Sequence, residues 1–154
     1  MSGIIEAKLS ELGITLPEAA APAANYVPFV KTGNQLFISG QIPMNADGIQ
    51  FQGKLGDTMQ TAQGADAAKL CAINLIAQMK AATGDLDKVA RVVKLVGFVN
   101  STGDFSEQPA VINGASNFMV EVFGDKGRHA RSAVSAASLP FGVAVEIEAI
   151  VELS

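Results

Sequence analysis

Residues 138–153 read SLPFGVAVEIEAIVEL, and the part from Val143 onward alternates between apolar and mostly acidic side chains. Successive side chains of a β-strand point to opposite faces of its sheet. We therefore expect a final strand over residues 143–153 with one face buried in a core. That face carries Val143, Val145, Ile147, Ala149, Val151 and Leu153. The opposite face carries Glu146, Glu148 and Glu152.

The rest of the chain predicts a short helix, a hairpin, two long helices and two further strands. Residues 4–12 have the apolar spacing of a helix and precede a proline-containing connector. The following elements are predicted as hairpin strands over 26–31 and 35–39, a helix over 58–82, a strand over 89–99, a helix from a cap at Ser106 to Phe123, and strands over 131–136 and 143–153. This order indicates an α+β fold with both long helices packed on one side of a mixed sheet. It also indicates one domain over residues 1–154, with residues 1–13 as an appendage helix.

The composition favours a single domain that associates with copies of itself. At 154 residues the chain is long enough to bury a core without disulfides or metals. Hydrophobic residues make up 49% of the chain and charged residues only 17%, which is little polar surface for a small monomer. The open face of such a sheet must be shielded from water, and we expect another copy of this chain to cover it.

Charge and cysteine content narrow the classes of function. A net charge of -4 and a pI of ≈ 4.9 disfavour a nucleic-acid partner. The single cysteine, Cys71, lies on an apolar helical stripe and is expected in the core rather than in a disulfide or zinc site. The chain begins without a signal-peptide pattern, and no stretch approaches the ~20 apolar residues that a membrane span needs. We therefore expect a cytoplasmic protein without a membrane partner or metal.

Arg131 and Glu146 are the residues best suited to chemistry on a substrate. An arginine is a planar, permanently charged fork that can grip a carboxylate through two parallel hydrogen bonds. Glu146 could orient or activate a water beside it, so the pair suggests chemistry on a small organic acid. From the residues alone, Arg131 also fits a surface ion pair, and Glu146 also fits a solvated side chain on a polar strand face.

The only histidine, His129, lies two residues before Arg131 and invites a reading as general base. A histidine in a loop is more often simply exposed. There is no second histidine for a ribonuclease-type acid and base pair or for a histidine metal site.

Three motifs carry a resemblance to a known family: residues 39–43 (SGQIP), Arg131-Ser132 followed by Leu139-Pro140, and residues 145–150 (VEIEAI). Over residues 21–153 the chain resembles the Rid or YjgF proteins, reactive intermediate imine deaminases that are also labelled endoribonuclease L-PSP. The N-terminal helix resembles that of a longer subgroup. The resemblance implies a chorismate-mutase-like α+β fold and a homotrimer with a central β-barrel. It also implies clefts between subunits that hold small carboxylates.

The resemblance also assigns roles to individual residues. Arg131 matches the arginine that grips the substrate carboxylate, and Glu146 matches the acidic residue that positions water. Two positions depart from the family pattern: Ala133 replaces a common cysteine, and Gly103 replaces a common asparagine. A backbone N–H at Ala133 could still donate to a ligand. The residues expected to bind substrate are Arg131, Tyr26, Ser39, Gly40 and Ala133.

The function implied by the resemblance is hydrolysis of 2-imino and 2-enamino acids to 2-oxo acids and ammonia, without a cofactor. A non-enzymatic trimer that binds a 2-oxo acid or an amino acid in the same clefts is the alternative, because it needs the same arginine. A ribonuclease or translation inhibitor is disfavoured by the acidic pI and by the lack of a basic, aromatic groove.

Overall fold

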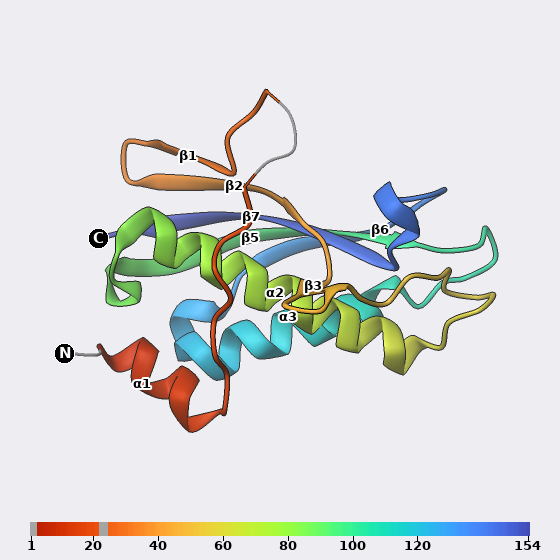
Figure 1. The fold of residues 1–154 in the computed structure, drawn as a ribbon, viewed down its shortest axis with the longest axis horizontal. Helices are drawn as coiled ribbons and strands as arrows, with labels where there is room; N and C mark the ends of the chain where they lie inside the picture. Colours follow the sequence, from red (N-terminus) through yellow and green to blue (C-terminus); the bar gives the residue numbers. More distant parts are fainter. Residues whose placement is uncertain (1–2, 22–24) are drawn as a thin grey trace.

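The computed structural model describes residues 3–21 and 25–154 and contains one five-stranded mixed sheet with helices on one side (Figure 1). The strand order is β1-β2-β7-β5-β6, in which only β5 and β6 are parallel. The strands are β1 (Phe29–Thr32), β2 (Gln35–Gln41), β5 (Val89–Asn100), β6 (Ala130–Ala136) and β7 (Val145–Leu153). The predicted α+β fold with a mixed sheet is confirmed.

The two long helices are α2 (Thr61–Thr83) and α3 (Gln108–Phe123), and both pack on the same face of the sheet (Figure 1). They cross at close range, since a Cβ atom on Gly114 of α3 would lie 2.7 Å from the carbonyl carbon of Ala65 on α2. Cys71 is fully buried between α2 and the sheet, as predicted, and burial raises the pKa of its thiol well above the usual value. The core therefore lies between the helix pair and one sheet face.

Three 3₁₀ turns connect these elements. They are η1 (Leu86–Lys88), η2 (Gly124–Gly127) and η3 (Pro140–Gly142). The turn η3 lies between β6 and β7, directly follows Leu139 and begins with Pro140 of the Leu-Pro motif. Among the described residues, no helix has the length and apolar character needed to cross a membrane.

The N-terminal helix α1 (Ile4–Glu11) is docked on the helical layer rather than on the sheet (Figure 1). The Asp87 carboxylate accepts hydrogen bonds from the backbone N–H groups of Ile4 and Ile5, each at 2.9 Å, which satisfies unpaired donors of the first helical turn. These two hydrogen bonds hold the pKa of Asp87 below its usual value. Leu9 is buried in the core. The predicted appendage helix is therefore an integral part of the domain.

The open face of the sheet, away from the helices, carries large apolar side chains. Phe37 on β2 pairs with Val30 on β1 and with Ile150 on β7, and paired residues share a face. Val30 is 52% exposed, Phe37 is 40% exposed and Val134 on β6 is 45% exposed. The acidic residues that the sequence placed on this face of β7 lie beside these side chains.

Several element bounds differ from the sequence-based expectations: β1 begins at Phe29 rather than at Tyr26, α2 at Thr61 rather than at Thr58, and β7 at Val145 rather than at Val143. The helix α3 begins at Gln108 and is preceded by Glu107, so the predicted cap at Ser106 is wrong. A small hairpin of β3 (Met44–Asn45) and β4 (Gly48–Ile49) was not predicted. Its turn is closed by Asn45, whose side-chain oxygen accepts a hydrogen bond from the Asp47 backbone N–H at 2.9 Å.

Candidate functional site

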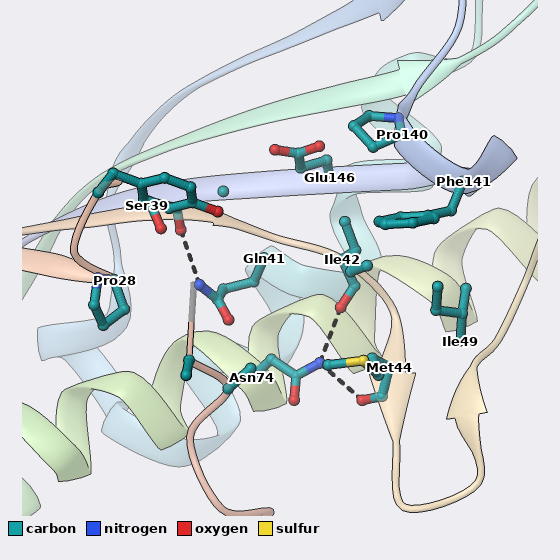
Figure 2. Close-up of a pocket in the computed structure, with 14 residues that line it drawn as sticks. Pro28, Ser39, Gln41, Ile42, Met44, Ile49, Asn74, Pro140, Phe141 and Glu146 are labelled. Carbon is teal, nitrogen blue, oxygen red and sulfur yellow. Dashed lines mark hydrogen bonds between the residues drawn. The ribbon is translucent and has the colours of Figure 1, made fainter. Parts of the chain in front are cut away.

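A pocket of about 310 Å³ opens where β2 bends away from the end of β7 (Figure 2). Its walls come from the connector before β1, from β2, from the β3–β4 hairpin and from η3, with single residues from α2 and β7. Four of the residues predicted for the site line it: Tyr26, Ser39, Gly40 and Glu146. Most of the other lining side chains are apolar.

A bulge in β2 brings its backbone close to Glu146. Ile38 pairs with Ala149 and Gln41 with Ile147, so β2 advances three residues while β7 advances two. Gly40 lies inside this bulge, and a Cβ atom there would lie 2.9 Å from the carboxyl carbon of Glu146. Glycine at this position leaves the space that the Glu146 side chain occupies.

Glu146 is half-buried at the pocket wall, and its side chain accepts no hydrogen bond from any described residue. Burial raises the pKa of this carboxyl above its usual value, and the nearby charge of Glu148 raises it further. A carboxylate with a raised pKa and free lone pairs is suited to holding a water and accepting its proton.

Two other polar side chains of the pocket are already used by the fold. Asn74 on α2 donates from Nδ2 to the carbonyl groups of Ile42 and Met44, both at 2.9 Å (Figure 2). Gln41 donates from Nε2 to the Ser39 carbonyl at 3.1 Å. These contacts fix the backbone around the pocket, and they leave Glu146 as its ionisable group together with the Tyr26 phenol.

Arg131, on β6, is held against α3 by three acceptors. Its Nη1 donates to Oδ1 of Asn113 at 2.8 Å and to Oγ of Ser116 at 3.2 Å, and its Nη2 donates to the Pro109 carbonyl at 3.3 Å. Nε donates to no described residue. The Nη1–Nη2 side of the guanidinium therefore faces α3, and the Nε–H with the second N–H of Nη2 forms the parallel pair that a carboxylate accepts.

His129 supports this arrangement and is not the freely exposed loop residue that the sequence suggested. Its Nδ1 lies 2.6 Å from the Gly127 carbonyl, so Nδ1 carries the proton in the neutral ring. Nε2 then accepts from the Ser116 hydroxyl at 2.8 Å. Burial lowers the pKa of His129, and the Arg131 charge lowers it further, which favours this neutral form. The hydrogen bond to Gly127 acts in the opposite direction.

One chain does not bring Arg131 and Glu146 together, although the sequence suggested that Glu146 orients a water beside Arg131. Arg131 pairs with Leu95, whose side chain is buried against the helices. Glu146 pairs with Phe98, which pairs in turn with the exposed Val134 on the open face. Because side chains alternate across a strand, the two residues belong to opposite faces of the sheet.

Ala133 lies on the same sheet face as Arg131, because it follows Arg131 by two positions and packs against the core. It therefore does not line the pocket of its own chain. Gly103 lies in the loop before α3, with open space around it. Within the described residues, no group of three or more His, Cys, Asp and Glu side chains could hold a metal ion.

The sequence patterns did not indicate that the β3–β4 hairpin and η3 form parts of the pocket. Met44 and Ile49 come from the hairpin, and Phe141 comes from η3. The Asp47-Gly48 pair is a turn signal that could have located the hairpin. No comparable signal marks Ser116, because a serine in the middle of a helix has no distinctive pattern.

The family model described as "YjgF/chorismate mutase-like, putative endoribonuclease" matches residues 6–153. Protein TCP17 of Trypanosoma cruzi is 54% identical over 154 residues, which cover 99% of this chain and 96% of that protein. A 2-iminobutanoate/2-iminopropanoate deaminase of Dermatophagoides farinae is 33% identical over 90% of this chain and 93% of its own length.

A solved structure agrees in fold. The crystal structure of Atu1372, a protein of unknown function from Agrobacterium tumefaciens, has a TM-score of 0.91 and 54% sequence identity. The match covers 97% of this chain and 92% of that one. With the family match extending over nearly its whole length, this chain belongs to the YjgF/chorismate mutase-like family, which includes the Rid proteins.

Proposed function

We propose that this protein hydrolyses reactive 2-imino and 2-enamino acids to 2-oxo acids and ammonia, in clefts completed by two subunits. The observation that carries the proposal is the guanidinium of Arg131, whose one side is fixed by α3 and whose other side is free for a carboxylate. The related deaminase of Dermatophagoides farinae gives the reaction class.

The clefts require a second copy because the two halves of the site lie apart in one chain. Glu146 lines the pocket, whereas Arg131 lies on the other sheet face at the β6 edge. Among the described residues that line the pocket, none carries a positive charge, so a substrate carboxylate there would lack a partner. Arg131 of a neighbouring subunit would supply it.

The open sheet face supports the assembly of this oligomer. Val30, Phe37 and Val134 are between 40% and 52% exposed on that face. Burying such side chains stabilises an interface by roughly 25 cal/mol per Å² of apolar surface. We propose a homotrimer in which the open faces of three sheets line a central β-barrel, as in the family resemblance.

In the proposed reaction, Arg131 binds the substrate carboxylate and leaves the C=N carbon facing a water held by Glu146. The water oxygen adds to this carbon while Glu146 accepts the water proton and passes it to the imine nitrogen, which gives an amino alcohol and restores the carboxylate. Glu146 then relays the hydroxyl proton to the amino group, so that the C–N bond breaks, the C=O bond of the 2-oxo acid forms and ammonia leaves. Because imines also hydrolyse spontaneously, positioning and proton transfer are enough for a useful rate gain.

The test is the rate of imine loss with 2-imino acids generated in place by an amino acid oxidase and trapped by semicarbazide. We expect the wild type to accelerate imine loss and Arg131→Ala to lose about 100-fold of this acceleration, since a desolvated charge pair is broken. Arg128→Ala is the matched control, because Arg128 is an exposed arginine near Arg131 whose ion pair is with Asp125.

The outcomes separate the proposed function from its alternative. Equal activity in folded Arg131→Ala would refute the role of Arg131. Binding of 2-oxo acids by the wild type without any turnover would instead favour the non-enzymatic binding or regulatory trimer.

A further inference from the structure

Phe141, in η3, combines high exposure with an unusual backbone conformation. Its φ angle is 60° and its ψ angle is 13°, which is the left-handed region that bulky residues rarely adopt. The residue is also 68% exposed, so burial within this chain adds little stability from its apolar ring. Neither its backbone nor its exposure is explained by packing within this chain.

The segment around Phe141 is held by three hydrogen bonds with residues 51–53, of which it accepts two and donates one. Nε2 of Gln52 donates to the Phe141 carbonyl at 2.8 Å, and the Gly53 N–H donates to the Gly142 carbonyl at 2.9 Å. The Ala144 N–H donates to the Phe51 carbonyl at 2.9 Å. Backbone strain persists only where the surroundings over-determine it, and such strain collects at ligand-binding sites.

The ring of Phe141 forms part of the pocket wall. Figure 2 shows it extending from η3 towards Ile42, with Ile49 below it and Pro140 above it. Glu146 lies further along the same wall. The end of the pocket next to the ring is therefore apolar, and the Glu146 carboxylate lies between this end and Ser39.

We propose that Phe141 is a specificity-determining residue that packs on the side chain of an apolar substrate. This inference rests on the proposed function and adds the substrate class: imino acids derived from aliphatic or aromatic amino acids of leucine to phenylalanine size. The reacting carbon lies near Glu146, and the side chain extends between Phe141 and Ile49. A substrate with an acidic side chain is disfavoured, because that charge would enter an apolar end without a cation.

A role of the Phe141 ring in the pocket wall accounts for the left-handed backbone conformation at this residue. In an extended conformation at residue 141, the Cβ atom would point in another direction and the ring would leave the pocket wall. The hydrogen bonds from Gln52 and Gly53 fix the turn and thereby the ring. A rigid apolar wall distinguishes side chains by size without ordering a loop on binding.

The experiment compares hydrolysis of the imines of alanine, leucine, phenylalanine and aspartate by the wild type and by Phe141→Asn and Phe141→Leu. Asparagine tolerates the left-handed backbone and removes the ring, whereas leucine keeps a smaller apolar group. We expect kcat/KM for the leucine and phenylalanine imines to fall about tenfold in Phe141→Asn and by less in Phe141→Leu. The alanine imine should change less than threefold in both variants.

Binding of the unreactive 2-oxo acid of leucine and of pyruvate, measured by calorimetry, keeps this inference separate from the proposed function. If the wild type hydrolyses no imine, the proposed function is refuted. Even then, a Phe141 variant that no longer binds the larger 2-oxo acid in preference to pyruvate would support the role of Phe141. Unchanged preference in the folded Asn variant, or equal losses for every ligand together with a change of oligomer mass, would overturn it and make Phe141 an interface residue.

Discussion

The Arg131 region and the Glu146 region of this domain are built in opposite ways. Arg131 is surrounded by acceptors, and Asn113, Ser116 and Pro109 fix its orientation through hydrogen bonds. Glu146 stands among apolar groups, accepts no hydrogen bond from a described residue, and has its pKa raised mainly by burial. The hydrogen bonds around Arg131 fix the direction of its charge, whereas burial raises the proton affinity of the Glu146 carboxylate.

This difference fits the separate roles that the proposed reaction gives to the two regions. A group that binds a carboxylate needs a fixed direction, which hydrogen bonds supply. A group that accepts a proton near neutral pH needs a raised pKa, which burial supplies. The two regions lie on opposite faces of the sheet, so under the proposed function neither region alone would be a complete site.

The largest expected effect is that of removing the proton acceptor. Glu146→Gln keeps the shape and removes the charge, so we expect kcat to fall about 10² to 10⁴-fold while the protein stays folded. The binding of 2-oxo acids should weaken little. Glu152→Gln, on the same strand face but away from the pocket, is the matched control and should keep wild-type kcat. Full activity in Glu146→Gln would show that water needs no base here.

A smaller effect is expected when the orientation of Arg131 is loosened. Ser116→Ala removes one acceptor of Nη1 and the partner of His129, so we expect KM to rise about tenfold with a smaller change in kcat. Asn117→Ala changes the next residue of α3, which is exposed, and is the control. Steady-state kinetics at fixed pH measure both. If Ser116→Ala and Asn117→Ala behave alike, the hydrogen bonds from α3 do not orient the guanidinium for substrate.

The smallest expected effect is a shift of the pH profile. In the proposed reaction Glu146 acts as a carboxylate, so we expect activity to be lost as the pH falls through its pKa, which lies above the usual value. Glu148→Gln removes the second cause of this raised pKa and leaves burial in place. We expect the acid limb of kcat/KM to move to lower pH, but not as far as the usual glutamate value. An unmoved limb would mean that another group controls it.

Much of the fold could be predicted because its elements follow regular periods. The alternation in β7 located the buried face, and the apolar spacing of α2 and α3 located the helices within a few residues. The small β3–β4 hairpin has strands of only two residues, which are too short to show any period. The start of α3 was misplaced because Ser106 fits a cap by type, although the helix begins after Glu107.

The site could be predicted only residue by residue. Tyr26, Ser39, Gly40 and Glu146, which the resemblance assigned to the site, line one pocket. The contribution of Phe141 depends on a backbone conformation that residues 51–53 impose from a distant part of the chain. The separation of Arg131 and Glu146 depends on the strand order, since β5 lies between β6 and β7. The pairing of strands that are distant in the sequence cannot be predicted from a local sequence pattern.

The most direct measurement is complementation between two inactive variants. Arg131→Ala and Glu146→Gln are unfolded together, refolded together to mix their subunits, and assayed for imine hydrolysis beside each variant refolded alone. If each site takes Arg131 from one subunit and Glu146 from the next, random mixing leaves about one quarter of the sites intact. We expect recovery of about a quarter of the wild-type rate. A mixture that assembles to mixed oligomers and stays as inactive as its parents would show that the two residues do not act together across a subunit interface.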